Sequence, residues 1–404
     1  MRISLTQAQE TIAAALMPLR VPFESLGLDE AFGRFLGEDV QIAHALPPFA
    51  ASAMDGYALR HADLAIGSDL HCIGESRAGS AFCGPMQALD CVRISTGAPI
   101  PAAFDTIVMQ ENVERDGTRI RVLVSPPLGA NVRRAGDECA AGTRLLKRGD
   151  RLTARKLALA ATAGKARVRV HVSPRVAILS TGDELAMPGS SLQAAQIFES
   201  NSVMLQAMVR TAGALPIPVA AVGDTPDALL SSLSQMSAVA DLIITTGGAS
   251  VGDHDHLPEL LLREGAMHFW KVQIKPGMRA IFGEIHGTPV LALPGNPVSA
   301  YVTFLKLALP AIRALQGLPP PLPQRWRGRL AQPLQKAHVR VEYRRAGHYF
   351  DATGQLWIEP IGTPDSHRIH ALTQSSVLVP MPAGSVDWAT GTVVDVEPIE
   401  EWLG

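Results

Sequence analysis

Cysteine is scarce in this sequence: the four residues Cys72, Cys83, Cys91 and Cys139 stand at irregular spacings, with no CxxC pair. This pattern fits neither a zinc site nor a disulfide framework, and it favours a reducing compartment. Residues 1–20 lack a sustained apolar segment, and no later run of about 18 residues is apolar and uncharged. We therefore expect a cytoplasmic protein that neither is secreted nor spans a membrane.

Long runs of one charge are also missing, and the formal net charge is only −2. This balance argues against nucleic acid or an anionic membrane as the main partner, although it is compatible with a small, local anion site. A chain of 404 residues is too long for one hydrophobic core, and its 47% apolar content can supply several. We expect two to four folded domains.

The first segment is expected to be helical. Thr6 and Gln9 have the spacing of a capping box ahead of the apolar run 12–17. Proline at positions 18 and 22 would end this helix.

Residues 47–139 contain short apolar runs, such as CVRIS, DTIVM and RIRVLV, broken by glycine, proline and aspartate. They predict a small β-rich unit. A helix over residues 153–163 follows, and Gly164 is its expected stop.

Strand-like and helix-like segments alternate between Arg175 and Leu315, which predicts a mostly parallel sheet covered by helices. The predicted strands are VAIL, IPVAAV, LIIT and VLAL, and the predicted helices span 202–211, 228–236 and 298–315. The stiff segment GLPPPLPQ, residues 317–324, marks a domain boundary. Beyond it, VRVEY, LWIEP, SVLVP and TVVDVEP predict a small β-barrel or sandwich.

The predicted fold class is therefore multidomain α/β plus β. Four parts are expected: a helical N-terminal linking part, an inserted β-rich domain, a central α/β domain and a small C-terminal β domain. Their boundaries are 1–46 with 140–173, 47–139, 174–317 and 318–404.

Three of the predicted parallel strands end in unusual loops: STGDE at 180–184, TTGGASVGDHD at 245–255 and LPGNP at 293–297. Ligands of open α/β sheets gather beyond the carboxyl ends of the strands, so these loops are expected to line one cleft. Gly247, Gly248 and Gly252 would let the backbone approach phosphate oxygens, and Ser250 offers a hydroxyl. The alternative for such a loop is an ordinary turn.

LPGNP leads directly into a helix, whose free N–H groups favour an anion, although it could also be only a proline-stiffened turn. In FWKVQIKPG, a period of two would put Trp270, Val272 and Ile274 on one face of a strand. Lys271 and Lys275 would then share the other face. They could neutralise a pyrophosphate or an oxyanion over the glycine loop, or belong to a solvated edge.

Carboxylates could complement the charges of these lysines. Each of them could instead be a turn residue, a helix-start residue or a solvated side chain. Gathered beside phosphate-binding loops, they would instead suggest a Mg²⁺ site, because Mg²⁺ takes carboxylate, water and phosphate oxygens. His254 and His256 lack a third spaced ligand, so zinc is disfavoured. The carboxylates are Asp55, Glu138, Asp183, Glu184, Asp224, Asp253 and Asp255.

Taken together, SAMDGYA, STGAPIP, STGDEL, TTGGASVGDHD, FWKVQIKPG and LPGNPVSA occur in the order found in the molybdopterin molybdenumtransferase (MoeA) family, which includes the C-terminal domain of gephyrin. The sequence resembles that family over nearly its whole length. The resemblance implies an elongated homodimer of four domains per subunit, with a MoaB/MogA-like α/β domain and an N-terminal dimerisation part. It also implies a cleft between the α/β domain of one subunit and the SAMDGY-bearing domain of the other.

The implied reaction is an exchange in which adenylylated molybdopterin and molybdate, the substrates, give the molybdenum cofactor and AMP. Mg²⁺ is the implied cofactor. The molybdopterin adenylyltransferase and molybdoenzyme maturation factors are suggested as further partners, with no nucleic acid and no membrane.

The resemblance also carries residue roles. The implied catalytic residues are Asp55, Thr96, Glu184, Asp224, Asp255, Lys271 and Lys275. The implied substrate-binding residues are Gly247, Gly248, Ser250, Gly252, Pro294, Gly295, Asn296, Pro297 and Ser366. The implied metal ligands are Asp55, Glu138, Glu184, Asp224 and Asp255.

Three motifs depart from the family pattern. KPGMR stands where relatives often have KPGKP, so Met278 removes a cation that Arg279 could replace. RRAGDE has its two acids in the order Asp137, Glu138, and DSH at 365–367 replaces glycine-serine-histidine. Two other functions fit parts of the sequence: a non-catalytic scaffold like gephyrin, and another nucleotide-processing enzyme with the same α/β domain.

Overall fold

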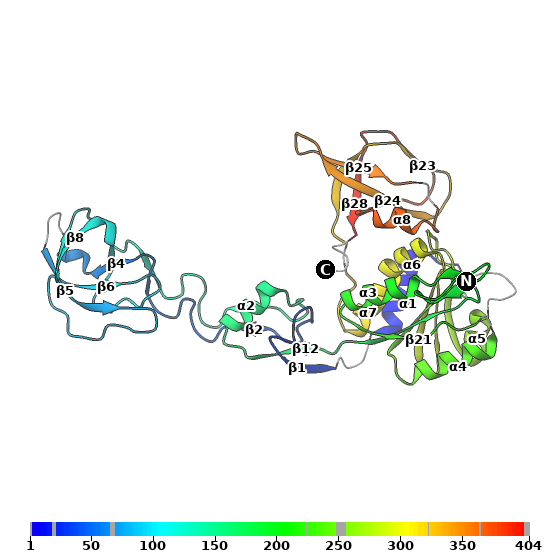
Figure 1. Ribbon diagram of the computed structural model, residues 1–404, viewed down its shortest axis with the longest axis horizontal. Coiled ribbons are helices and arrows are strands. Elements are labelled where there is room, and N and C mark those ends of the chain that lie inside the picture. Colours follow the sequence, from blue (N-terminus) through cyan, green and yellow to red (C-terminus); the bar gives the residue numbers. More distant parts are fainter. Residues whose placement is uncertain are drawn as a thin grey trace. The chain divides into compact units, whose positions relative to one another are not determined.

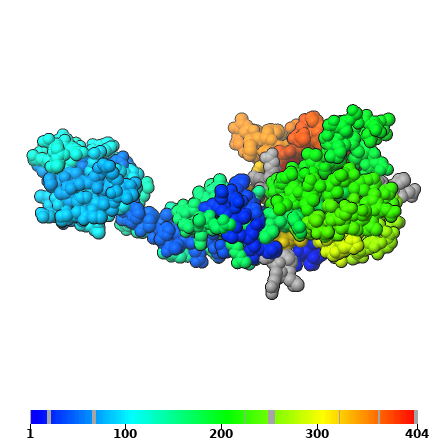
Figure 2. Space-filling view, turned by 60° about the horizontal axis from the view of Figure 1, so that its bottom comes forward, coloured from blue at the N-terminus to red at the C-terminus, as the bar shows by residue number. Residues whose placement is uncertain are grey.

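The computed structural model divides the chain into two compact units (Figure 1). The first comprises Met1–Ser25, Gly33–Phe35 and Arg169–Gly404, and the second Leu26–Phe32 and Leu36–Val168. The structure describes residues 2–17, 22–64, 69–223, 225–247, 256–321, 323–362 and 365–399. A space-filling view of the same chain is given in Figure 2.

The second unit is built around a six-stranded sheet of order β7-β4-β6-β5-β9-β8, as the short apolar runs predicted. Alternate residues of these strands face opposite sides, and each face has its own apolar cluster, one around Tyr57 and Cys91 and the other around Val92 and Phe104. The strands are β4 Gly56–Leu59, β5 Asp69–Ser76, β6 Asp90–Ile94, β7 Thr106–Met109, β8 Val113–Asp116 and β9 Arg119–Val122.

Short elements complete this unit. Helix α2, Ala154–Thr162, begins after Thr153, and Gly164 follows its C-terminus with φ +79°, which confirms the predicted helix and its stop. The short helices and strand pairs are η1 His61–Asp63, η2 Gln110–Asn112, β2 Val40–Gln41 with β11 Arg144–Leu146, and β3 Ala51–Ser52 with β10 Val132–Arg133. Strands β1 Phe23–Gly27 and β12 Arg167–His171 form a separate two-stranded sheet.

The predicted N-terminal helix exists, but its cap lies earlier than predicted. Helix α1, Leu5–Leu16, begins after Ser4. The Ser4 hydroxyl accepts the Gln7 N–H at 3.2 Å, and the Gln7 side chain accepts the Ser4 N–H at 2.9 Å. The prediction of Thr6 and Gln9 as the capping box is therefore wrong, because Ser4 supplies the same chemistry and leaves Thr6 inside the helix.

The central sheet of the first unit has the order β16-β13-β17-β21-β20-β18. Its first four strands run parallel, as the alternation predicted, and β20 and β18 extend it antiparallel. The strands are β13 Arg175–Ser180, β16 Leu215–Pro218, β17 Leu242–Thr246, β18 Gly265–Trp270, β20 Ile281–Ile285 and β21 Thr288–Leu293.

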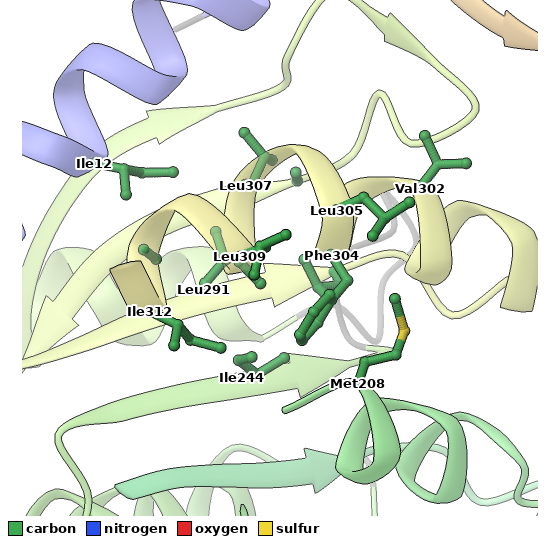
Figure 3. Packing of buried hydrophobic residues seen from close by; sticks show 14 of the residues in the cluster. Ile12, Met208, Ile244, Leu291, Val302, Phe304, Leu305, Leu307, Leu309 and Ile312 are labelled. Carbon is green, nitrogen blue, oxygen red and sulfur yellow. The ribbon is translucent and has the colours of Figure 1, made fainter. Parts of the chain in front are cut away.

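Helices cover both faces of this sheet. On one face α1, α3 and α6–α7 pack into a large cluster with Ile244 and Leu291 of the sheet (Figure 3). On the other, α4 and α5 pack on Ile243 and Val290. The helices are α3 Asn201–Thr211, α4 Pro226–Ser237, α5 Leu257–Glu264, α6 Pro297–Thr303 and α7 Leu309–Leu315, and α5 is absent from the sequence prediction.

Helices α6 and α7 are joined without a break by a π-helical turn, Phe304–Ala308. The whole run, Pro297–Leu315, is long and apolar enough to cross a membrane, with a mean hydropathy of 1.4. However, 89% of it is buried inside the protein, as expected for a core helix.

FWKVQIKPG does not form the single strand that its alternation suggested. β18 ends at Trp270, Lys271 takes φ +77°, and the separate strand β19, Ile274–Lys275, joins the C-terminal sheet instead. Trp270 consequently packs on the α4–α5 face of the central sheet, whereas Val272 and Ile274 pack on the opposite face. The prediction that these three residues face one way is wrong, because a left-handed residue interrupts the period of two.

The C-terminal strands close into a barrel, which decides between the two expected folds. The order β24-β25-β22-β28-β26 returns to β24, and β19 pairs in parallel with the first two residues of β24, Val341 and Glu342. The strands are β22 Trp326–Leu330, β24 Val341–Phe350, β25 Leu356–Pro360, β26 Val377–Met381 and β28 Val393–Pro398. The smaller elements are β14 Leu185–Ala186 with β15 Ile197–Phe198, β23 Leu334–Lys336 with β27 Val386–Trp388, and α8 Ile369–Thr373.

Candidate functional site

A cavity of about 770 Å³ lies at the carboxyl ends of β13, β17 and β21. All of its lining residues belong to the first unit. The loops after the three strands meet there, together with the start of α3, the KPGMR segment and one residue before α8. The lining residues are 180–182, 184–185, 197–201, 246–247, 277–279, 294–297, 299 and 367.

Six of the residues to which the resemblance assigned a role line this cavity: Glu184, Gly247, Pro294, Gly295, Asn296 and Pro297. The structure therefore brings the three loops together, as expected for the carboxyl edge of a parallel sheet. Gly248, Ser250, Gly252, Asp224 and Asp255 lie outside the described residues.

Asn201, which the sequence analysis missed, ties these loops to one another. Its amide donates to the Thr246 hydroxyl at 2.8 Å and to the Gly295 carbonyl at 2.6 Å. It can do so because it is the first residue of α3, which starts beside both loops. No sequence motif marks this role, because Asn201 stands in an ordinary helix-start sequence.

Glu199 fixes that helix start. Its side chain is buried, with 3% of the residue exposed, and it accepts hydrogen bonds from Ser180 Oγ at 3.0 Å and from Ser202 N at 2.8 Å. The Ser202 hydroxyl is a third donor to the same carboxylate. Both carboxylate oxygens therefore already accept hydrogen bonds within the protein, and one of these bonds satisfies an N–H of the first turn of α3.

Two glycines are required by the close packing of the cavity wall. Gly247 has φ +88°, and a Cβ there would lie 2.3 Å from the Thr181 carbonyl oxygen. Gly277 has φ +109°, and its Cβ would lie 2.2 Å from Thr303 Cγ2. Both distances are shorter than any ordinary contact, so larger residues would displace the wall.

Asn296 connects the LPGNP loop to the segment DSH. Its amide donates to Ser366 Oγ at 2.8 Å, and the Val298 N–H donates to the Ser366 carbonyl at 3.1 Å. Ser366 thus lies at the start of the helix 297–315, and its neighbour His367 lines the cavity. Asp365, which stands where the family pattern has glycine, is compatible with both hydrogen bonds of Ser366.

Arg279 is the one lysine or arginine in the described lining of the cavity. It follows Gly277 and Met278 in the segment where the family pattern has a second lysine, and the Val272 N–H donates to the Met278 carbonyl at 2.9 Å. A guanidinium can bind two oxygens of a phosphate or an oxyanion at once. The sequence indicated Arg279 only as a possible replacement for the cation that is missing at Met278. The fold shows that it lines the cavity.

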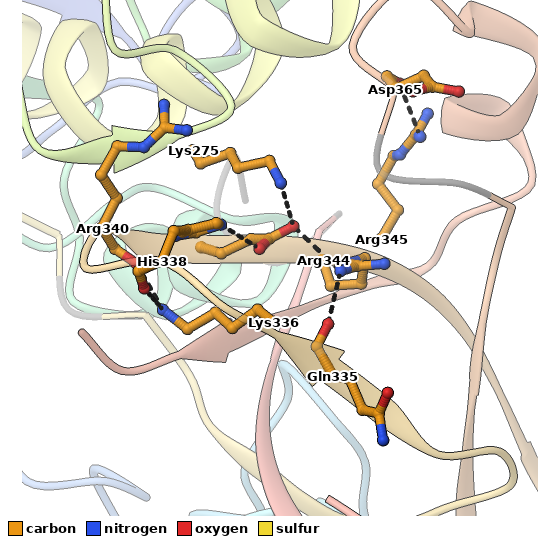
Figure 4. Close-up of polar contacts among 9 residues, drawn as sticks. Lys275, Gln335, Lys336, His338, Arg340, Arg344, Arg345 and Asp365 are labelled. Atoms are coloured by element: carbon orange, nitrogen blue, oxygen red, sulfur yellow. Dashed lines mark hydrogen bonds and ion pairs between the residues drawn. The ribbon is translucent and has the colours of Figure 1, made fainter. Parts of the chain in front are cut away.

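Lys271 and Lys275, expected over the glycine loop, are not among the lining residues. The Lys271 ammonium lies 4.6 Å from the ring centre of Trp270. Lys275 Nζ lies 3.5 Å from a carboxylate oxygen of Glu342, which also binds His338 and Arg344 (Figure 4). In the described structure Lys275 therefore points toward a cation-rich group beside β24.

Asp55 and Thr96 meet in the second unit. The Asp55 carboxylate accepts the Thr96 N–H at 2.6 Å and the Thr96 hydroxyl at 2.9 Å. These hydrogen bonds hold the pKa of Asp55 below its ordinary value, because they stabilise the charged form. Glu138, in the same unit, is exposed. From the sequence, only the resemblance to the MoeA family linked Asp55 with Thr96.

The described residues do not assemble a magnesium site by themselves. Across the ranges that the structure covers, no group of three or more acidic, histidine or cysteine side chains could hold a metal ion. Glu184 is exposed on the cavity wall, whereas Glu199 is occupied by serine donors. Two of the predicted ligands, Asp224 and Asp255, lie outside the described residues.

A parallel sheet whose loops enclose a cavity lined by glycines, hydroxyls, amides and an arginine defines an α/β protein with a site suited to an anionic small molecule. Comparison with known proteins specifies the family. Residues 3–164 match the MoeA N-terminal region (domain I and II), residues 177–314 a probable molybdopterin binding domain, and residues 327–399 the MoeA C-terminal region (domain IV).

Individual relatives match over the whole length. The chain is 34% identical to a molybdopterin molybdenumtransferase of Haemophilus influenzae, covering 100% of both proteins. It is 37% identical to molybdopterin molybdenumtransferase 2 of Mycobacterium tuberculosis, covering 96% of this chain and 98% of that protein. A crystal structure of the molybdopterin biosynthesis MoeA protein of Pyrococcus horikoshii OT3 matches with a TM-score of 0.82 at 25% identity, covering 98% and 100% of the two chains. The chain belongs to the molybdopterin molybdenumtransferase (MoeA) family.

Proposed function

We propose that this protein is a molybdenum insertase: it transfers molybdenum from molybdate into adenylylated molybdopterin and releases AMP. The full-length similarity to molybdopterin molybdenumtransferases carries this proposal. The cavity supports it, because Glu184, Gly247 and the LPGNP loop are all among its lining residues. No feature of the described structure favours a pure scaffold or a different nucleotide enzyme over this reaction.

The chemical difficulty of the reaction is electrostatic. Molybdate and a pterin phosphoanhydride are both anions, and they repel each other unless cations and N–H groups intervene. We assign the guanidinium of Arg279 to the anionic groups of the substrates, with backbone amides of the Gly247 and Gly295 loops beside it. The protein would then contribute positioning and charge neutralisation.

Release of AMP by the purified protein, given adenylylated molybdopterin and molybdate, tests the proposal. A charge-assisted hydrogen bond contributes about 1.5–3 kcal/mol, so Arg279→Ala should lower kcat/KM about ten- to hundredfold. Arg279→Lys should recover part of this loss, and Arg263→Ala, on the exposed side of α5, is the matched control. Binding of adenylylated molybdopterin without any AMP release by the wild-type protein would refute the insertase.

We further propose a homodimer in which Asp55 and Thr96 of the partner subunit complete the site. Mixing two inactive variants, Asp55→Ala and Glu184→Ala, tests this arrangement. Random exchange of subunits makes half of the dimers mixed, each with one intact site, so about one quarter of the wild-type activity should return. If each site lay within one subunit, the mixture would stay inactive.

Mg²⁺ is proposed as the cofactor, with Glu184 as the exposed carboxylate among the described lining residues. When bound, it would neutralise phosphate charge together with water and substrate oxygens. AMP release that is unchanged after chelation and independent of added Mg²⁺ would contradict this assignment. We expect the protein to act in the cytoplasm, with the adenylyltransferase and molybdoenzyme maturation factors as candidate partners.

A further inference from the structure

Two cysteines of the second unit lie opposite each other on neighbouring strands. β5 and β6 run parallel, and Cys72 of β5 is in register with Cys91 of β6. Residues in register on parallel strands project to the same face of the sheet, and both cysteines belong to the apolar cluster around Tyr57 and Leu70. Neither cysteine is in a disulfide.

The strand geometry allows a bond between them. Neighbouring strands are about 4.8 Å apart, which falls within the Cα–Cα range of about 4.4–6.8 Å found in disulfides. The register of β5 against β6 shifts between Cys72 and Glu75, so β5 is irregular just beyond the pair.

The two thiols differ in the way that a reactive pair requires. Cys72 is half-buried; its thiol can donate to the Gly74 carbonyl at 3.5 Å, and the Cys91 thiol, the Arg93 backbone and the charge of Arg115 also act on its sulfur. The contacts with Cys91 and with the Arg93 backbone lower the pKa of Cys72, which favours its thiolate form. Cys91 is fully buried, and its contact with Cys72 and its burial raise its pKa.

We propose that Cys72 and Cys91 form a redox site at which hydrogen peroxide makes a reversible intramolecular disulfide. The Cys72 thiolate attacks one peroxide oxygen, giving a sulfenic acid and hydroxide. The Cys91 thiol then attacks the Cys72 sulfur, the S–S bond forms, and water leaves with the second oxygen. One peroxide takes up two electrons, and the two thiols lose two electrons and two protons. A dithiol reductant reverses the change.

The site lies on the strand that leads to Thr96. β6 runs from Asp90 to Ile94, and Thr96, two residues further on, holds the Asp55 carboxylate. A covalent link between β5 and β6 therefore tethers the strand that presents this pair. The redox chemistry itself does not depend on the proposed insertase activity.

Mass spectrometry of the full-length protein tests the proposal. Trypsin cleaves after Arg60, Arg77 and Arg93, so Cys72 lies in fragment 61–77, and Cys91 shares fragment 78–93 with Cys83. The experiment therefore uses the variant Cys83→Ser/Cys139→Ser, in which only Cys72 and Cys91 remain. One equivalent of peroxide should remove both thiols and join the two fragments, and dithiothreitol should separate them.

The control adds Cys72→Ser to the same background, and fragment joining should vanish. Because that variant could alter packing, iodoacetamide labelling of the unmodified protein supplies a second measurement. Cys72 should be labelled at pH 7 at least tenfold faster than Cys91. Unjoined fragments after peroxide treatment, joining only in denaturant, or equal labelling of the two thiols would each overturn the proposal.

Discussion

Asn201→Ala should open the edge of the cavity without unfolding the protein. The Asn201 amide is the direct connection between the start of α3, the end of β17 and the LPGNP loop, through its bonds of 2.8 Å to Thr246 and 2.6 Å to Gly295. Each such bond contributes about 0.5–1.5 kcal/mol, so the two together hold the loop by about 1–3 kcal/mol. Their loss leaves the sheet and the large cluster beneath it in place.

Hydrogen exchange is the suitable assay, because it measures local opening in a chain with two compact units. The Val298 N–H, bonded to the Ser366 carbonyl, reports on the loop. A loss of about 1–3 kcal/mol accelerates its exchange about 5- to 150-fold, since 1.4 kcal/mol is a factor of ten. In the insertase assay, KM for adenylylated molybdopterin should rise more than kcat falls.

The control is Gln196→Ala, which removes a side chain that accepts only the Gln193 N–H, at 3.1 Å, within an exposed turn near the cavity. Its exchange rates and KM should match those of the wild type. Exchange at Val298 within twofold of wild type in Asn201→Ala, together with an unchanged KM, would refute the view that Asn201 holds the loops.

Three further outcomes follow from single features of the first unit. Glu397→Gln should destabilise the contact between the barrel and the π-helical turn by about 3–5 kcal/mol in urea unfolding, because it leaves the buried ammonium of Lys306 without its charged partner. The double variant Lys306→Met with Glu397→Leu removes both charges and should be near neutral. Gly277→Ala should lower the unfolding midpoint and raise KM, because the new methyl group would strike Thr303, and an unchanged midpoint would contradict the packing. Hydrogen bonds from Thr353 and Trp357 lower the pKa of Asp351 to about 2, so this acid stabilises the barrel above its unfolded pKa of 3.8. Stability should fall from about pH 4 to pH 2 in the wild type and less steeply in Asp351→Asn, as followed by tryptophan fluorescence.

The family and the fold class were accessible from the sequence because they rest on local signals. The strands before STGDE, TTGG and LPGNP are apolar runs that end in glycine or proline, and any parallel sheet brings such ends to one edge. The prediction of a cleft among these loops therefore needed no distances. Helix α2 with Gly164 was equally local, since a helix of this length carries its own stop signal.

The errors arose where tertiary contacts overrode a local pattern. The alternation in FWKVQIKPG was real, but Lys271 takes a left-handed conformation, and β19 pairs with β24 of the barrel, which lies more than sixty residues further along the chain. A periodicity of two cannot report a partner strand that is distant in sequence. For the same reason Lys275 reaches Glu342 in the described structure, a residue that no motif had marked.

The sequence by itself determined the family, the α/β core and the residues of the three loops, because local hydrophobic periodicity and glycine chemistry are written in consecutive residues. Only the tertiary structure decided that Asn201 and Glu199 hold the loops together, that Arg279 supplies the cation of the cavity wall, and that Cys72 faces Cys91. These relations join segments far apart in the chain. The strength of these contacts depends on interatomic distances, which are set by the packing of the folded chain.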